Sequence, residues 1–297
     1  MPELPEVHTI IVDLQRAGIE GSRVVDADVS WPRSVGGDAE RFRTGLRGWQ
    51  IASLHRRGKY LRFDGTHVEE SGARAEASSL LVHLRMSGRL FLLDHPAPRT
   101  GYERVILFLE DSNGRPRELH FYDPRKFGRV LFVSDPDSRL EQLGMEPLEP
   151  EFTAEALARG LQRPRRIKPL LLDQTVVAGL GNIYVDEALW RARIHPERRA
   201  NTLSTAELHA LHEAIPAVLR RGIANLGTSL GSGKTNFVFP HGDSRAQNQE
   251  QLKVFHRTGL PCPRCGTAIQ RIKVAQRSSH FCPQCQLGEP TTASVRR

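Results

Sequence analysis

The sequence lacks any long apolar stretch, and no convincing internal repeat is visible along its 297 residues. No apolar run approaches the ~20 residues that a membrane-spanning helix needs. The first ten residues, MPELPEVHTI, also lack the basic start and apolar centre of a secretory signal. We therefore expect an intracellular protein, of the cytoplasm or nucleoid, without a membrane partner.

Cysteine is absent from most of the chain, and the four that occur lie close to its end. Cys262, Cys265, Cys282 and Cys285 form the pattern C-x2-C-x16-C-x2-C, in which each pair can grip one metal ion from a tight turn. Two disulfides are the alternative, but a reducing compartment disfavours them. Because four thiolates fill a tetrahedral shell, the pattern predicts one structural Zn2+, and no cysteine is left over for thiol catalysis.

Acidic residues are fewer than basic ones. Lys and Arg number 42 and Asp and Glu 34, which gives a net charge of +8 and a sequence pI near 9.7. This balance favours an anionic partner, most simply nucleic acid, although a basic surface alone predicts only non-specific attraction. The length is sufficient for two domains with separate cores.

The chain reads as strands followed by helices. Strands are expected within 23–31, 48–64, 79–94, 104–111 and 117–133, and helices within 153–163, 167–177, 181–192 and 204–227. The last helix has a capping-box start, Ser204 with Glu207, and Pro216 should kink it. The polar segment 64–79 is expected to be a surface loop. We place an N-terminal β-sandwich domain at 1–134, a linker at 135–152, a helical domain at 153–251 and the four-cysteine finger at 252–297.

Two prolines and two glutamates precede the first apolar pattern. Ordinary helix chemistry explains Pro5 and Glu6, since Pro and carboxylates both suit a first helical turn. It does not explain Pro2. If Met1 is removed, Pro2 becomes a secondary amine whose pKa the helix dipole would lower, and its attack on a sugar carbon would give an iminium ion. Glu3 is then the adjacent proton donor and acceptor.

Four separated features together resemble the formamidopyrimidine-DNA glycosylase and endonuclease VIII family of base-excision repair enzymes. They are PELPE at the terminus, HRRGKY in a strand, LLDQTVVAGLGNIYVDEALW between helices, and the finger. They occur in the family's order over nearly the whole chain, and PELPE favours the formamidopyrimidine branch. The resemblance implies an α+β multidomain fold: an antiparallel β-sandwich with a leading helix, a helix-two-turn-helix domain and a β-hairpin zinc finger. It also implies a monomer acting on damaged double-stranded DNA.

The resemblance assigns catalytic roles to four residues. Pro2 matches the proline that attacks C1′, expels the base and drives β- and δ-elimination, and Glu3 matches the acid/base carboxylate. Lys59 matches a lysine that binds phosphate and assists elimination, although a solvated basic strand end is the alternative. Arg277, inside the finger, matches an arginine that holds the phosphates beside the lesion.

Further matches predict DNA contacts. Because a base must leave the stack before it can be processed, something must fill the gap. Met86, Arg125 and Phe127 match the trio that does so, although a core methionine is the plainer interpretation of Met86 alone. The expected phosphate contacts are His83, Lys168 and Asn182. The alternative for His83 is a structural histidine in a strand, and Lys168 has basic neighbours that could bind the phosphate in its place.

Two segments depart from the family pattern, and other functions remain open. Residues 227–251 lack the family's usual loop, so the resemblance says least about which damaged base is bound, and TGYERV replaces a histidine-rich segment. GSGKT suggests a P-loop, but Thr228 stands where its first glycine is required. An endonuclease VIII-like enzyme for oxidised pyrimidines and a non-catalytic DNA reader are the alternatives. The main hypothesis is removal of 8-oxoguanine and formamidopyrimidines opposite cytosine.

Overall fold

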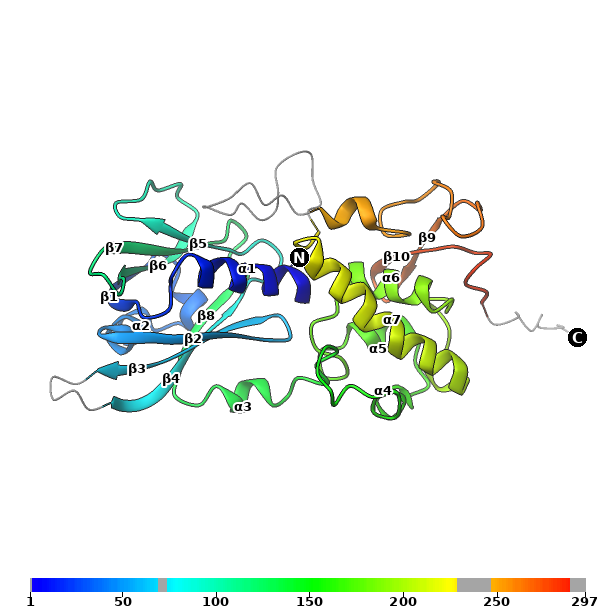
Figure 1. Ribbon diagram of the computed structural model, residues 1–297, viewed down its shortest axis with the longest axis horizontal. Coiled ribbons are helices and arrows are strands. Elements are labelled where there is room, and N and C mark those ends of the chain that lie inside the picture. The colour runs from blue at the N-terminus through cyan, green and yellow to red at the C-terminus, as the bar shows by residue number, and fades with distance from the viewer. Residues whose placement is uncertain (1, 69–73, 229–246, 289–297) are drawn as a thin grey trace, which may run out of the picture. The chain divides into compact units, whose positions relative to one another are not determined.

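The computed structural model describes residues 2–68, 74–228 and 247–288, and these divide into two compact units (Figure 1). Unit 1 comprises Met1–Gln142 with Asn225–Gln247, and unit 2 comprises Leu143–Ala224 with Asn248–Arg297. Among the residues so described, no helix is both long enough and apolar enough to cross a bilayer.

Unit 1 opens with helix α1 and continues mainly as strands. Helix α1 (Leu4–Arg16) ends at Ala17, and the next residue, Gly18, has the left-handed φ of +74° that glycine adopts without strain. The strands are β1 (Arg23–Val29), β2 (Trp49–Arg57), β3 (Tyr60–Val68), β4 (Arg74–His83), β5 (Arg89–Asp94), β6 (Glu103–Glu110), β7 (Pro116–Tyr122) and β8 (Arg129–Val133). Three short helices accompany them: η1 (Pro32–Val35), α2 (Ala39–Leu46) and α3 (Asp137–Leu140).

The eight strands form one antiparallel sheet in the order β5-β7-β6-β1-β2-β3-β4-β8. Strands β1 and β2 pair only through Arg23 and Gln50, so the sheet consists of two four-stranded halves joined at one position. Apolar side chains from both halves share one core, and α1 adds Val7, Ile10, Ile11 and Leu14 to it while contacting β2 and β3. The antiparallel sandwich with a leading helix is therefore as predicted.

Residues 64–68 and 74–79 differ from the expected surface loop, and residues 69–73 of that prediction lie outside the described residues. Strands β3 and β4 continue through the described parts of this segment, with Asp64 opposite Ser79 and Thr66 opposite Ala77. Gly65 lies inside β3, where a Cβ would clash with the Gln50 carbonyl oxygen and come within 2.7 Å of the Trp49 ring, so only glycine fits there. The prediction is wrong there because polar residues and a glycine lie in these strands, which are extended by backbone pairing and not by a hydrophobic pattern.

Unit 2 consists of helices and a hairpin. Its elements are α4 (Ala154–Leu161), α5 (Ile167–Leu172), α6 (Asn182–Arg191), η2 (Ala200–Thr202), α7 (Thr205–Ala224), η3 (Asn248–Gln251), β9 (Gln270–Val274) and β10 (Arg277–Phe281). The predicted capping box is confirmed, since Ser204 N–H donates to Glu207 and Glu207 N–H to Ser204 Oγ. Pro216 lies inside the continuous helix α7. Helix α6 contacts α5, α7 and β10, which makes it the central element of this unit.

Candidate functional site

The N-terminal residues are buried and held in a fixed arrangement. Glu3 caps helix α1: its carboxylate accepts the backbone N–H of Glu6, and its own N–H donates to Glu6 Oε2 at 2.8 Å. Pro2 is also buried, and Glu3 and Glu6 are each only 2% exposed. A reciprocal capping box satisfies helix N–H groups that would otherwise lack partners. Here it also orients the carboxylate that follows Pro2.

Glu6 has a second partner far along the chain. Its Oε1 accepts the N–H of Thr228 at 2.7 Å. Gly227 has a φ of +80°, and a Cβ there would come within 2.9 Å of Glu6 Cγ, so glycine is the residue that permits this approach. Glu6 thus ties the start of α1 to residues 227–228. Most of the departing loop and the GSGKT segment follow immediately and lie outside the described residues.

Lys59 and His83 occupy neighbouring positions at one end of the sheet. Gly58 and Lys59 are the loop between β2 and β3, with Gly58 at φ +56°, and Tyr60 pairs with His83. Lys59 is 6% and His83 8% exposed. Burial, with the charges of Arg85 and Lys59, lowers the pKa of His83 to about 3. The ring is therefore neutral, and because its Nδ1 accepts the Arg85 N–H at 3.1 Å, Nε2 carries the proton and is a donor.

Met86, Arg125 and Phe127 lie on two turns that one carboxylate holds together. Met86 and Phe127 are 45% and 47% exposed, and the Arg125 guanidinium lies 4.8 Å from the centroid of the Phe127 ring. The fully buried Asp123 accepts hydrogen bonds from Ser87 Oγ at 2.5 Å and from the N–H groups of Arg125, Phe127 and Gly128 at 3.2, 2.7 and 2.7 Å. Asp123 thereby joins the two turns that carry the predicted trio, and Met86 and Phe127 are partly exposed to solvent.

The segment TGYERV, which departs from the family pattern, contains two polar residues that make several hydrogen bonds. Glu103 accepts bonds from Thr100 N, Thr100 Oγ1 and Gly101 N at 2.9, 2.7 and 2.9 Å. Burial raises the pKa of Glu103, but these bonds outweigh it and the pKa falls to about 2. Arg104 Nε donates to the Asp123 carbonyl at 2.8 Å. The altered segment therefore supports the same turn as Asp123 does.

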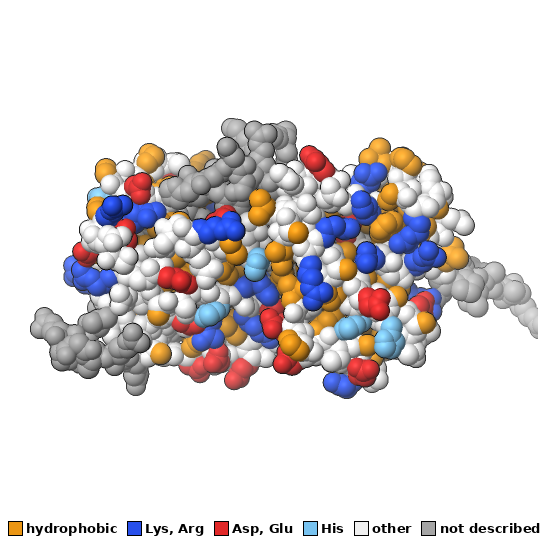
Figure 2. All heavy atoms as spheres, viewed as in Figure 1, with side chains coloured by type: hydrophobic (Ala, Val, Ile, Leu, Met, Phe, Trp, Pro, Cys, Tyr) orange, Lys and Arg blue, Asp and Glu red, His pale blue; other side chains and the backbone are white. Residues whose placement is uncertain are grey.

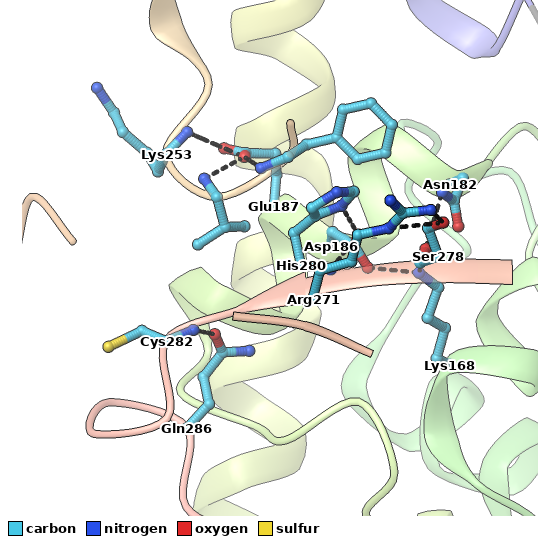
Figure 3. A network of polar contacts seen from close by, with 12 residues as sticks. Lys168, Asn182, Asp186, Glu187, Lys253, Arg271, Ser278, His280, Cys282 and Gln286 are labelled. Carbon is cyan, nitrogen blue, oxygen red and sulfur yellow. Dashed lines mark hydrogen bonds and ion pairs between the residues drawn. The ribbon is translucent and has the colours of Figure 1, made fainter. Parts of the chain in front are cut away.

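Lys168 is not exposed as a phosphate ligand would be. Its side chain is fully buried, and Nζ lies 2.6 Å from Asp186 Oδ1 and 2.7 Å from the carbonyl of Ser278 (Figure 3). The other oxygen of Asp186 accepts the N–H of His280 at 2.8 Å. These contacts join α5, α6 and strand β10. The predicted DNA contact of Lys168 stays a prediction, and the geometry favours a positioning role for it.

Asn182 and Arg277 lie next to this buried network. Asn182 is the first residue of α6, and its Nδ2 donates to the Ser278 carbonyl at 3.0 Å, while its Oδ1 is buried without a described partner. Arg277 is exposed and begins β10. The hairpin turn before it places Ala275 and Gln276 at φ +45° and +65°. Asn182 and Arg277 are thus linked through the neighbouring residue Ser278.

The four cysteines form one compact cluster. Their Sγ atoms all lie within 4.8 Å of one another, with closest pairs at 3.4, 3.5 and 4.0 Å. A disulfide would need about 2.05 Å. Four sulfurs at about 2.3 Å from a tetrahedral zinc would lie about 3.8 Å apart. The donor set therefore fits one zinc ion, which would cross-link the two ends of the finger.

Charge is distributed over the surface as the composition suggests. Lys and Arg side chains are visible on the viewed face of each unit, with apolar side chains between them (Figure 2).

A buried carboxylate of α6 has a structural role. Glu187, 1% exposed, accepts the N–H groups of Lys253, Val254 and Phe255. Burial raises the pKa of Glu187, although these N–H groups and Arg221 act in the opposite direction.

Several structural carboxylates were missed by sequence reasoning. Asp123 had a local signal, because Asp before Pro commonly accepts N–H bonds within a turn. Asp186 and Glu187 had none, since both lie in helix α6 and their partners come from other elements. Asp186 contacts Lys168 of α5 and His280 of β10, and Glu187 contacts residues 253–255 and Arg221 of α7.

Three family models match the chain. The formamidopyrimidine-DNA glycosylase N-terminal domain matches residues 1–130, the corresponding H2TH domain 143–232, and a zinc finger found in FPG and IleRS 259–287. Together they confirm the predicted series of domains and the zinc finger.

Curated proteins and solved structures agree with these matches. Formamidopyrimidine-DNA glycosylase of Protochlamydia amoebophila is 41% identical over 289 residues, covering 96% of this chain and 99% of that protein. The corresponding protein of Pelotomaculum thermopropionicum is 44% identical over 293 residues, covering 96% and 99%. A Lactococcus lactis FPG mutant in complex with DNA containing Fapy-dG superposes with a TM-score of 0.84 at 36% identity, covering 96% of this chain and 100% of that one. Lactococcus lactis Fpg has also been solved with an abasic site and with an oxidised pyrimidine in DNA.

Proposed function

Because the chain belongs to the formamidopyrimidine-DNA glycosylase family, we propose roles for its residues in the family's reaction. The protein is a DNA glycosylase of base-excision repair that removes oxidised purines, and it is also a lyase for the abasic site. The observation that carries the assignment of roles is the buried N-terminal arrangement of Pro2, Glu3 and Glu6.

The reaction begins at the nitrogen of Pro2 once Met1 has been removed. Its lone pair attacks C1′ of the damaged nucleotide, and the bond from C1′ to the base breaks with protonation of the departing base. Opening of the sugar gives an iminium ion between Pro2 and C1′. Glu3, whose carboxylate the capping box orients, exchanges protons with the sugar. Loss of a C2′ proton then expels the 3′ phosphate, and a second elimination expels the 5′ phosphate.

Phosphate binding is assigned to residues from both units. Lys59 supplies a positive charge beside the elimination steps, and neutral His83 donates from Nε2. Asn182 retains a second amide hydrogen beyond the one given to Ser278, and it stands at the N-terminus of α6, where a helix favours anions. The exposed guanidinium of Arg277 offers several donors. Lys168 contacts Ser278 and Asp186, and through Ser278 it positions Asn182 and Arg277.

The trapping experiment tests the nucleophile. Borohydride reduces an iminium ion to a stable covalent adduct, so wild-type protein should become attached to DNA carrying 8-oxoguanine. Pro2→Gly should trap poorly, and a retained N-terminal tag should abolish trapping with folding intact. Glu3→Gln should bind the lesion yet lose base excision, because the amide keeps the size but not the ionisable group. Full trapping by protein shown by mass spectrometry to retain its tag would rule out Pro2.

Lesion preference is tested with matched duplexes. Arg125 has the donors to read the edge of an orphaned cytosine, and Met86 and Phe127 are exposed enough to fill the gap beside it. We therefore expect 8-oxoguanine and formamidopyrimidine opposite cytosine to be excised faster than thymine glycol. The Lactococcus lactis complex with an oxidised pyrimidine makes the thymine glycol comparison essential. Faster turnover of thymine glycol, or indifference to the opposite base, would favour an endonuclease VIII-like specificity.

We also propose that the protein acts as a monomer on nucleoid DNA. All assigned catalytic, phosphate-binding and zinc-binding residues belong to one chain. A sedimentation experiment with and without duplex should therefore give the mass of one chain, and of one chain per duplex. Trapping also separates this enzyme from a non-catalytic DNA reader, because a reader would bind without leaving a covalent adduct.

A further inference from the structure

The first cysteine turn of the finger rests on the C-terminal end of helix α6. Cys262 is 2% exposed and packs with Val254, Ile269 and Cys282 in a small core, against which the Trp190 ring lies. Trp190 is the penultimate residue of α6. An apolar side chain of another type would fill the same space, so burial alone does not account for an indole here.

The indole is oriented toward a zinc ligand. Trp190 Nε1 lies 3.4 Å from Cys262 Sγ in hydrogen-bonding geometry. The N–H of Cys285 approaches Cys282 Sγ at the same distance, 3.4 Å, so both contacts are comparable in length. The Cys285 N–H belongs to the finger itself, whereas the Trp190 N–H comes from helix α6.

Arg264 fixes the orientation of the indole. Its guanidinium lies 4.2 Å from the centroid of the Trp190 ring, and its Nη1 donates to the Trp190 carbonyl at 3.1 Å. A second contact runs from Arg264 Nη2 to the Arg191 carbonyl at 3.4 Å. Because Arg264 lies between Cys262 and Cys265, the turn that carries two zinc ligands also holds the ring that donates to one of them.

The second cysteine turn is attached to the same region. Gln286, 1% exposed, accepts the N–H of Cys282 at 2.9 Å (Figure 3). It also donates to the carbonyl of Ile194 at 2.9 Å. Ile194 lies just beyond the end of α6. Both cysteine turns are therefore anchored near one helix end. Of these anchoring contacts among the described residues, the one from Trp190 ends on a sulfur and the one from Gln286 on a backbone N–H.

We propose that Trp190 is a positioning residue of the zinc site, whose indole N–H stabilises the metal-bound thiolate of Cys262. A hydrogen bond to a thiolate offsets part of its charge and holds the sulfur in the geometry that the metal requires. Partners of this kind, one step outside the ligands, typically change metal affinity 10–100-fold when removed. The inference concerns metal binding and does not depend on the roles proposed for Pro2 or Glu3.

The decisive comparison is Trp190→Phe against Trp31→Phe. Trp190→Phe keeps an aromatic ring for packing and for Arg264 but removes the N–H donor. Trp31→Phe removes an indole N–H that has no described hydrogen-bond partner and lies in unit 1. Chelator competition should show about tenfold weaker zinc binding for Trp190→Phe and no change for Trp31→Phe. In cobalt-substituted protein, only Trp190→Phe should shift the thiolate charge-transfer bands.

A second measurement needs no variant of Trp190. In wild-type protein loaded with NMR-active cadmium, one of the three indole protons should show coupling to the metal through the N–H···S bond. Absence of that coupling, together with zinc affinity of Trp190→Phe within twofold of wild type, would overturn the proposal. If Trp190→Phe fails to fold, the cadmium experiment alone decides: a coupled indole proton supports the proposal, and three uncoupled ones refute it.

Discussion

Replacing Asp123 with asparagine tests whether one carboxylate aligns the turns that carry Met86 and Phe127. One carboxylate oxygen accepts from Ser87 Oγ and Arg125 N, and the other from the N–H groups of Phe127 and Gly128. Asparagine presents one carbonyl oxygen and one NH2 group, which is a donor. Its less costly orientation points NH2 at the Ser87 hydroxyl, which can accept, and leaves the Arg125 N–H unpaired.

The loss of stability in Asp123→Asn can be estimated from these four hydrogen bonds. A hydrogen bond to a charged group contributes about 1.5–3 kcal/mol and one between neutral groups about 1 kcal/mol. Asp123→Asn loses one such bond and converts the other three to neutral ones. We therefore expect a loss of at least about 3 kcal/mol in the free energy of unfolding, a large fraction of the 5–15 kcal/mol that is typical of folded proteins.

Two assays separate stability from recognition. Urea unfolding measures the first, and the ratio of 8-oxoguanine excision opposite cytosine and opposite adenine measures the second. Asp123→Asn should lower both. Asp94→Asn is the matched control, because Asp94 is 82% exposed and pairs only with Arg117 in the described contacts. If Asp123→Asn keeps the wild-type ratio while folded, the carboxylate does not align the trio.

Three further changes have defined outcomes. Glu6→Gln replaces one acceptor oxygen with an NH2 donor that faces the backbone N–H of either Glu3 or Thr228. It should reduce the free energy of unfolding, measured in urea, by about 1.5–3 kcal/mol. Unchanged stability would exclude a structural role for these two hydrogen bonds of Glu6. Because the pKa of His83 is about 3 when folded and 6.5 as its ordinary value, its contribution to stability falls as pH drops from 6.5 toward 3. His83→Gln should therefore lose less stability than wild type between about pH 7 and pH 5, and an equal loss would contradict the prediction. Gln276→Gly should stabilise the hairpin by about 0.5–1 kcal/mol, because Gln276 has a φ of +65°, and a lower stability in urea unfolding would count against this.

Local patterns in the sequence were sufficient for several elements. The spacing of Cys262, Cys265, Cys282 and Cys285 predicts one metal cluster, and the sulfurs do meet. Short sequence separations within each pair make this possible, since a turn places two ligands together whatever surrounds it. The capping box at Ser204 is similarly local. The prediction of a loop was wrong at 64–68 and 74–79 because the pairing of β3 with β4 depends on contacts between strands and not on local sequence.

The series of domains and the zinc ligands could be predicted from the chain's local patterns, because each depends on neighbours a few positions apart or on motifs in a fixed order. Which side chains support the site depends on tertiary packing. It buried Lys168 against Asp186, brought Ser87 to Asp123 and aimed Trp190 at Cys262. Such contacts join residues that are distant in the chain. Strand register and helix packing bring them within hydrogen-bonding distance, and no local pattern encodes that.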